Sequence, residues 1–137
     1  MLTTENTEGT EIANREITDA IIASAITVHK SLGPGLLESV YEKCLSFELF
    51  ERGYDGTAQQ EVPLIYRNLR FESGFRADLI VANKVLVELK AVDQVLPIHH
   101  AQVLTYLKHL KLTGLKTALL INFNVLLLKE GLKRISL

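Results

Sequence analysis

The sequence has few of the residues that mark disulfide-rich, zinc-binding or strongly basic proteins. Its 137 residues include one cysteine and four histidines. Cys44 has no partner for an internal disulfide and lies among apolar positions of an expected helix, which is typical of a reduced interior. No His/Cys spacing suits zinc. The formal net charge is −1, so any contact with phosphate must come from a local patch of positive charge.

Long apolar runs and linkers are missing as well. The most apolar stretch, residues 117–128, is interrupted by Asn122 and Asn124 and is too short to cross a bilayer as a helix. Residues 1–10 are polar and acidic without the apolar core of a secretion signal, so we expect a flexible N-terminal tail. The whole chain has an ordinary globular composition, 47% hydrophobic and 23% charged. We expect one domain over residues 11–137, located in the cytoplasm and outside membranes.

Two helices are expected in the first half of the chain. Asn14 is a suitable N-cap, and apolar residues recur at helical spacing from Ile17 to Leu32 until Gly33 and Pro34 stop the run. After this break the pattern continues from Leu37 and ends near residue 53. The two helices should pack as a hairpin or corner.

Strands dominate the middle of the chain. Residues 61–66, 71–82 and 85–90 have strand composition and should form an antiparallel meander. Pro63 lacks an N–H, so its strand should lie at an edge or carry a bulge. A helix over residues 98–111, a buried strand over 117–123 beside the third strand, a short strand over 125–128 and a basic tail complete an α/β fold with a mixed sheet.

Asp78 and the triplet Glu88-Leu89-Lys90 lie on the two arms of one expected hairpin. Side chains alternate along a strand, so Glu88 and Lys90 project to the same face. Whether Asp78 joins them depends on the turn, because a slip of one residue sends every side chain to the other face.

We predict a turn with an odd number of residues, or a bulge, because only such a turn places Asp78 and Glu88 on the same face. A two-residue loop would place Asp78 and Glu88 on opposite faces. A three-residue loop, Ala82 to Lys84, would pair Val81 with Val85 and bring the two acidic residues together, with the central asparagine in the left-handed conformation that such loops require.

Two carboxylates and an ammonium on one face suit the metal-assisted hydrolysis of phosphodiesters. Carboxylate oxygens bind hard divalent cations such as Mg²⁺ or Mn²⁺, and a lysine can position the attacking water and neutralise charge on the phosphate. The pattern indicates a small nuclease in which Asp78, Glu88 and the Leu89 carbonyl hold the metal. Lys90 would position the water.

The sequence resembles the GxxExxY protein family. Gly35, Glu38 and Tyr41 occupy the named positions of that signature, within the run from Val28 to Tyr41. The likeness continues through four further segments: Phe75-Arg76-Ala77-Asp78-Leu79, Val87-Glu88-Leu89-Lys90-Ala91, the run from Ala101 to Leu107, and Leu120-Ile121-Asn122-Phe123. Such proteins resemble the PD-(D/E)XK nuclease superfamily. Its restriction-endonuclease-like core consists of a helix, a three-stranded meander, a helix and a further strand.

This resemblance implies a substrate and further site residues. The substrate would be nucleic acid, most naturally DNA, and Glu38 would reach the metal from the second helix, through water. Gln102 and Tyr106 match the pair that the RecB-like branch adds on the helix after the lysine strand, where they would orient substrate or lysine. Ala77 stands where the superfamily's name has proline, which carries no chemistry.

Each residue also has a purely structural interpretation. Glu88 and Lys90 can be a solvated pair, Asp78 can form an ion pair with Arg76, and Glu38 can be a first-turn carboxylate that favours the helix dipole. Gln102 alone carries no signal, and Tyr106 can be a core residue with its hydroxyl at the rim. His29, in the last turn of the first helix, can complement the helix dipole instead of serving a site.

Basic residues form two groups that can be either a phosphate-binding rim or a solvated face. One group is Lys108, His109, Lys111 and Lys116, and the other is Arg67, Arg70 and Arg76. A homodimer or a protein partner would add to the grip on nucleic acid. The alternative to a nuclease is a non-catalytic nucleic-acid-binding or protein-interaction scaffold of the same fold.

Overall fold

The computed structural model describes residues 4–137, with side chains from Ala13 onward. Two helices come first, α1 (Thr4–Leu32) and α2 (Glu38–Glu51). Three strands follow, and the rest of the chain alternates between helical turns and strands. In order, these elements are β1 (Gly56–Tyr66), β2 (Leu69–Val81), β3 (Val85–Lys90), α3 (Pro97–Leu110), the 3₁₀ turn η1 (Lys111–Thr113), β4 (Thr117–Asn122), the 3₁₀ turn η2 (Leu128–Gly131) and β5 (Leu132–Ser136).

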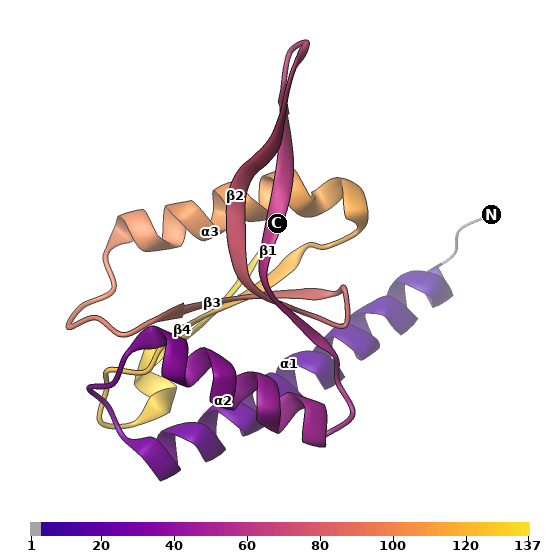
Figure 1. The fold of residues 1–137 in the computed structure, drawn as a ribbon. Coiled ribbons are helices and arrows are strands. Elements are labelled where there is room, and N and C mark those ends of the chain that lie inside the picture. Colours follow the sequence, from indigo (N-terminus) through magenta and orange to yellow (C-terminus); the bar gives the residue numbers. More distant parts are fainter. Residues whose placement is uncertain (1–3) are drawn as a thin grey trace.

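One five-stranded mixed sheet forms the centre of the fold, with the strands in the order β1-β2-β3-β4-β5. The first three strands make the predicted antiparallel meander. β4 lies parallel beside β3, and β5 pairs antiparallel with β4. α1 and α2 cover one face of the sheet and α3 covers the other (Figure 1). The predicted α/β architecture with a restriction-endonuclease-like core is confirmed.

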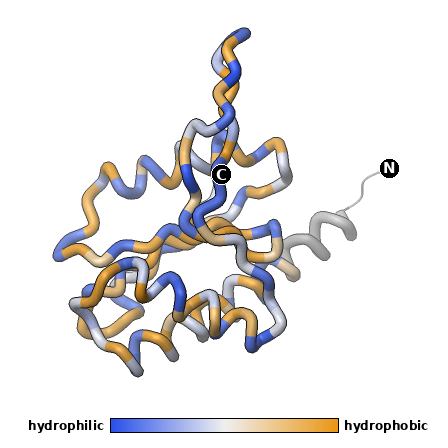
Figure 2. Tube along the Cα trace, viewed as in Figure 1, coloured by the Kyte–Doolittle hydropathy of each residue, from blue (hydrophilic) through white to orange (hydrophobic). Residues whose placement is uncertain are grey.

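The central strands are apolar on both faces because helices bury both sides. Leu79 and Val87 pack against α1 and α2, whereas Leu86 and Leu120 pack beneath α3. Figure 2 shows apolar residues concentrated along these strands. Within residues 4–137, no helix has the length and apolar content needed to cross a bilayer.

The turn between β2 and β3 is the predicted three-residue loop over residues 82–84. Val81 pairs with Val85, as that loop requires. Asn83 is in the left-handed region with φ 54°, and Ala82 joins it with φ 52°, which the sequence did not indicate. The two strands therefore pair in the register that sets the two acidic residues opposite one another.

The N-terminal helix starts earlier than the sequence indicated. α1 begins at Thr4, so the N-cap predicted at Asn14 is wrong, and residues 4–10 of the predicted tail continue the helix. No proline interrupts the chain before Asn14, so nothing obliges the helix to begin there. Residues 1–3 of that tail lie outside the described residues.

The C-terminal end also differs from the prediction. Residues 125–128 are not a strand but connect β4 to η2, and the residues predicted as a basic tail include β5. The chain reverses at Gly131, where a Cβ atom would lie 2.1 Å from the Asn122 carbonyl oxygen. Only glycine allows this close approach, which brings the start of β5 beside the end of β4, where Leu132 pairs with Ile121.

β1 and β2 continue beyond the sheet as a two-stranded arm, defined here as residues 61–76 (Figure 1). Its tip is the two-residue turn at Arg67 and Asn68, where Tyr66 pairs with Leu69. β1 is an edge strand, and its register shifts between Val62 and Leu64. Both expectations for the intervening proline are confirmed.

Tyr41 fixes the corner between α1 and α2. Its side chain is fully buried, and its ring stacks on Phe123 with centroids 4.5 Å apart. The hydroxyl donates to the Gly33 carbonyl at 2.6 Å and accepts from the Leu36 N–H at 3.1 Å. The corner itself needs left-handed glycine at position 33, where φ is 75°. Tyr41 therefore sets where α2 begins.

We expect Tyr41→Phe to destabilise the protein by about 1–3 kcal/mol, because two backbone groups lose their partner in a buried place. Urea unfolding followed by circular dichroism measures the change. Tyr66→Phe, at an exposed tyrosine of the arm, is the matched control and should unfold like the wild type. Equal free energies of unfolding for all three proteins would contradict this role of the Tyr41 hydroxyl.

Candidate active site

The β2–β3 ladder ends next to Asp78 and Glu88, whose side chains replace the backbone as acceptors. The last regular pair is Leu79 with Val87. Beyond it, the Asp78 N–H donates to Oε2 of Glu88 at 2.9 Å, and the Leu89 N–H donates to Oδ2 of Asp78 at 2.9 Å. The two carboxylates therefore lie together where the strands begin to separate.

Glu88 is the more buried of the two carboxylates, with 4% of its surface exposed. Its pKa is raised to about 8, first by burial and second by the negative charge of Asp78. The Asp78 N–H and the charge of Lys90 lower the pKa, and Glu38 raises it further. Without a bound metal ion, Glu88 therefore holds a proton at neutral pH.

Glu38 reaches the same place from the first turn of α2. Burial raises its pKa, the positive charge of Lys90 lowers it, and the negative charge of Asp78 raises it again. Glu38 therefore lies within electrostatic range of both strands. With Asp78 and Leu89 it lines a cleft of about 410 Å³, to which Glu42 also contributes.

The structure also brings residues of α3 to the cluster. The pKa of Tyr106 is raised by burial first and then by the charges of Glu88 and Asp78, and a hydrogen bond with Gln102 lowers it. The Tyr106 ring stacks on Phe75 of the arm, with centroids 4.1 Å apart. The half-buried Lys90, exposed Gln102 and half-buried Tyr106 thus lie at one end of the sheet.

Gln59 and Glu42 were missed by sequence reasoning. Gln59 is a non-glycine residue with φ 53°, opposite Asp78 at an interruption of the β1–β2 ladder. Its amide nitrogen donates to Oε1 of Glu42 and lies 3.4 Å from Oδ1 of Asp78. The spacing of four residues from Glu38 could have indicated Glu42. Nothing local indicates Gln59, because it precedes the strand predicted from residue 61.

Asn122 anchors the loop that follows the lysine strand. It is buried, its amide nitrogen donates to the Val92 carbonyl at 2.9 Å, and its Oδ1 accepts from the Val92 N–H at 3.1 Å. The Phe123 N–H donates to the Lys90 carbonyl at 2.9 Å. The sequence showed Asn122 only as an interruption of an apolar run, whereas the structure uses it to hold the end of β3.

The donor chemistry of the cluster fits a hard divalent cation. Asp78 and Glu88 each spend one oxygen on a backbone N–H and keep the other for a further ligand. The Oδ1 atom of Asp78 lies in the cleft beside Gln59. Among the residues whose side chains are described, no three acidic, histidine or cysteine side chains are already arranged to hold an ion.

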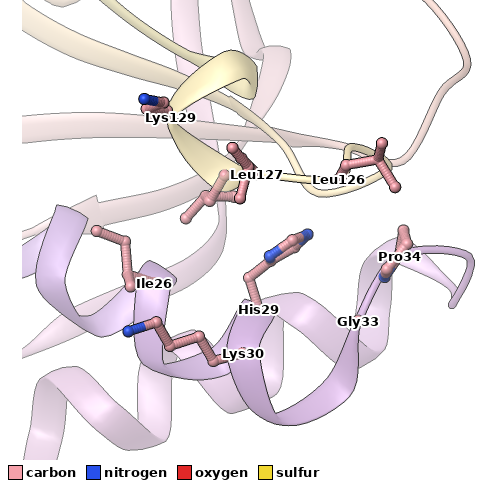
Figure 3. A pocket seen from close by; sticks show the side chains of 9 residues that line it. Ile26, His29, Lys30, Gly33, Pro34, Leu126, Leu127 and Lys129 are labelled. Carbon is pink, nitrogen blue, oxygen red and sulfur yellow. The ribbon is translucent and has the colours of Figure 1, made fainter.

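Two structural alternatives are resolved by the positions of other residues. Arg76 does not pair with Asp78, because its guanidinium lies 3.6 Å from Glu61 instead. His29 lies in a separate cavity of about 540 Å³, beside Lys30 and Lys129 (Figure 3). Its Nε2 bonds the Val125 carbonyl at 2.8 Å. His29 therefore does not join the carboxylate cluster.

We expect the metal-free protein to lose stability as the pH rises from about 4.5 to about 8. The carboxyl group of Glu88 ionises near pH 4.5 when the chain is unfolded, but keeps its proton up to about pH 8 when folded. Glu88→Gln keeps the hydrogen-bond acceptor without the charge. Its free energy of unfolding at pH 8 should therefore exceed that of the wild type by a few kcal/mol and should depend less on pH. Urea titrations in a chelator measure this.

The exposed Glu72 supplies the control for that experiment. Glu72→Gln removes one carboxylate from the arm, where 88% of the side chain is exposed, so its profile should follow the wild type. A wild-type stability that rises between pH 5 and 8 would refute the raised pKa of Glu88.

Comparison with protein families identifies the chain's relatives. The family model described as the PD-(D/E)XK nuclease superfamily matches residues 15–135. Comparison with curated proteins gave no significant match, and neither did comparison with solved structures. The matched range contains α2, the strands β1 to β4, all but the last residue of β5, and every residue of the cluster described above. This chain belongs to the PD-(D/E)XK nuclease superfamily.

Proposed function

We propose that the protein is a metal-dependent nuclease that hydrolyses phosphodiester bonds in DNA. The observation that carries the proposal is the pair of carboxylates at the end of the β2–β3 ladder, where Glu88 accepts from the Asp78 N–H and Asp78 accepts from the Leu89 N–H, in a chain of a nuclease superfamily. Burial and the like charge of Asp78 disfavour the ionisation of Glu88, so this pair would carry its full negative charge only beside a cation.

The metal ligands would be the carboxylates of Asp78 and Glu88 and the carbonyl of Leu89, with Glu38 supporting the ion through water. These groups are hard oxygen donors, which suit Mg²⁺ or Mn²⁺. The bound ion would polarise the phosphate and lower the pKa of a coordinated water.

Lys90 would hold the attacking water and offset the charge that develops on the phosphate. Its ammonium lowers the pKa of both Glu38 and Glu88, so it acts electrostatically on both carboxylates. Gln102 and Tyr106 would orient the substrate or the lysine from α3. Their hydrogen bond and the stacking of Tyr106 on Phe75 support a fixed position for this pair.

Two finer assignments belong to the same proposal. Gly35, Glu38 and Tyr41 occupy the positions that define the GxxExxY family, and Gln102 with Tyr106 matches the RecB-like branch. Tyr41 supports the first assignment through its role in the fold, because it holds the corner from which α2 presents Glu38.

A binding or scaffold function is the second candidate, and one observation favours it. Asp78 and Glu88 each accept from a backbone N–H, and among the residues whose side chains are described no three acidic, histidine or cysteine side chains converge on a possible ion site. A cluster of this kind can persist as a buried hydrogen-bonded network without turnover. The two candidates differ in whether DNA is cleaved.

We expect Lys90→Ala to lower the rate of DNA cleavage by at least about 100-fold, because it removes the group that positions the water. Cleavage of linear and circular DNA in Mg²⁺ or Mn²⁺ measures the rate. Lys84→Ala is the matched control, because it removes an exposed lysine at the other end of β3 and should keep the wild-type rate.

Calorimetric titration with the metal alone separates the two candidates. Asp78→Asn should abolish metal binding, whereas Lys90→Ala should retain it. Wild-type protein that binds metal tightly but cleaves no nucleic acid in any of these conditions would favour the scaffold and reject the nuclease.

A further inference from the structure

A second cleft, which we call the basic groove, lies between the arm and the C-terminal end of α3. It has a volume of about 320 Å³, and the buried side chain of Val62 forms part of its wall. Among the described residues that line it, every charged side chain is basic: Arg70 from β2, Lys108 from the end of α3, and Lys111 from η1, with His109 beside them. The groove therefore has a single sign of charge, in a chain whose formal net charge is −1.

Ion pairing does not account for these cations. Within the part of the chain whose side chains are described, neither Lys108 nor Lys111 forms an ion pair. Arg70 lies 3.3 Å from Glu72, but both side chains are more than half exposed. An exposed pair of this kind is worth little, so Arg70 remains available to a stronger anionic partner.

α3 connects the carboxylate cluster with the basic groove. Tyr106 stacks on Phe75 at the base of the arm and responds to the charges of Asp78 and Glu88. Lys108 to Lys111 follow it by two to five residues, so they lie about 3 to 8 Å further along the helix axis. A DNA strand advances about 3.4 Å per nucleotide, so this distance corresponds to about one or two nucleotides.

We propose that the basic groove binds the sugar-phosphate backbone of the nucleic acid whose scissile bond lies at the carboxylate cluster. The link to cleavage rests on the proposed function. Lysine and arginine are the side chains that neutralise phosphates, and the apolar wall beside them can contact sugars. A second copy of this chain in a symmetric, groove-to-groove pair would bring the same positive charge, so charge complementarity favours nucleic acid over a two-fold dimer through this groove.

The test measures the binding of DNA by the full-length protein. All variants also carry Lys90→Ala, which slows cleavage during the measurement. Fluorescence anisotropy with a short labelled duplex, and with its single strand, gives Kd over a range of salt concentrations in Mg²⁺. We expect Lys108→Glu with Lys111→Glu to raise Kd by at least about tenfold and to reduce the slope of log Kd against log salt by about two.

A matched double variant controls for total charge. Lys30→Glu with Lys129→Glu makes the same change of charge at the cavity of Figure 3, outside the basic groove, and should leave Kd and the salt slope close to those of the parent protein. Equal weakening by both double variants would overturn the inference. An altered sedimentation coefficient of the groove variant, together with an unchanged affinity for DNA, would also overturn it, because the groove would then bind a second copy of this chain.

The two proposals fail in different ways. If wild-type protein cleaves DNA while the groove variant binds like its control, only the groove assignment is wrong. If the groove variant weakens binding but no metal supports cleavage by the wild type, the groove is upheld as a binding surface and the nuclease proposal fails. A parent protein that binds neither duplex nor single strand would refute the groove.

Discussion

The site depends on the point at which β2 stops pairing with β3. Because β2 leaves the sheet there to form the arm with β1, the N–H groups of Asp78 and Leu89 need acceptors, and the carboxylates of Glu88 and Asp78 supply them. The same four groups thus terminate a ladder and gather two carboxylates. A cation would have to compete with two backbone donors for these side chains, but each has a second oxygen to offer. The same pair of residues therefore ends the β2–β3 ladder and would supply the ligands of the cation.

This arrangement is electrostatically unfavourable for the isolated protein. Glu38 and Glu88 have raised pKa values because burial and neighbouring carboxylates oppose their charge, and Lys90 offsets only part of this. Gln59 adopts a left-handed backbone at the same place, a further strain for a non-glycine residue. Stability must therefore come from elsewhere, namely the apolar layers on both faces of the sheet and the Tyr41 corner. Such local conflict in an otherwise consistent fold is typical of a site kept for its chemistry.

Local rules in the sequence predicted the parts of this design that depend on neighbouring residues. Side-chain alternation and the length of the turn were sufficient to place Asp78 opposite Glu88, and the missing N–H of Pro63 predicted an edge and a register shift. Contacts between distant segments were not accessible in this way. Gln59 meets Glu42 and Asp78 only because β1 starts earlier than its apolar pattern, and Asn122 holds Val92 across 30 residues of sequence. β5 was missed because the reversal that creates it depends on the contact of Gly131 with the backbone of Asn122.

The near-zero net charge conceals a separation of charge that matters more than the total. The cleft lined by Glu38, Glu42 and Asp78, here called the acidic cleft, adjoins α2, whereas the basic groove adjoins α3. The stacked rings of Phe75 and Tyr106 join the base of the arm to α3. Under these two proposals, the acidic cleft would repel a phosphodiester chain until a cation reversed its sign, whereas the basic groove would attract the chain at all times. Attraction in the groove would therefore hold the polyanion beside a cluster that alone disfavours it. A domain of this size can thus combine two opposite requirements, one for the cation and one for the substrate, without a strongly basic composition.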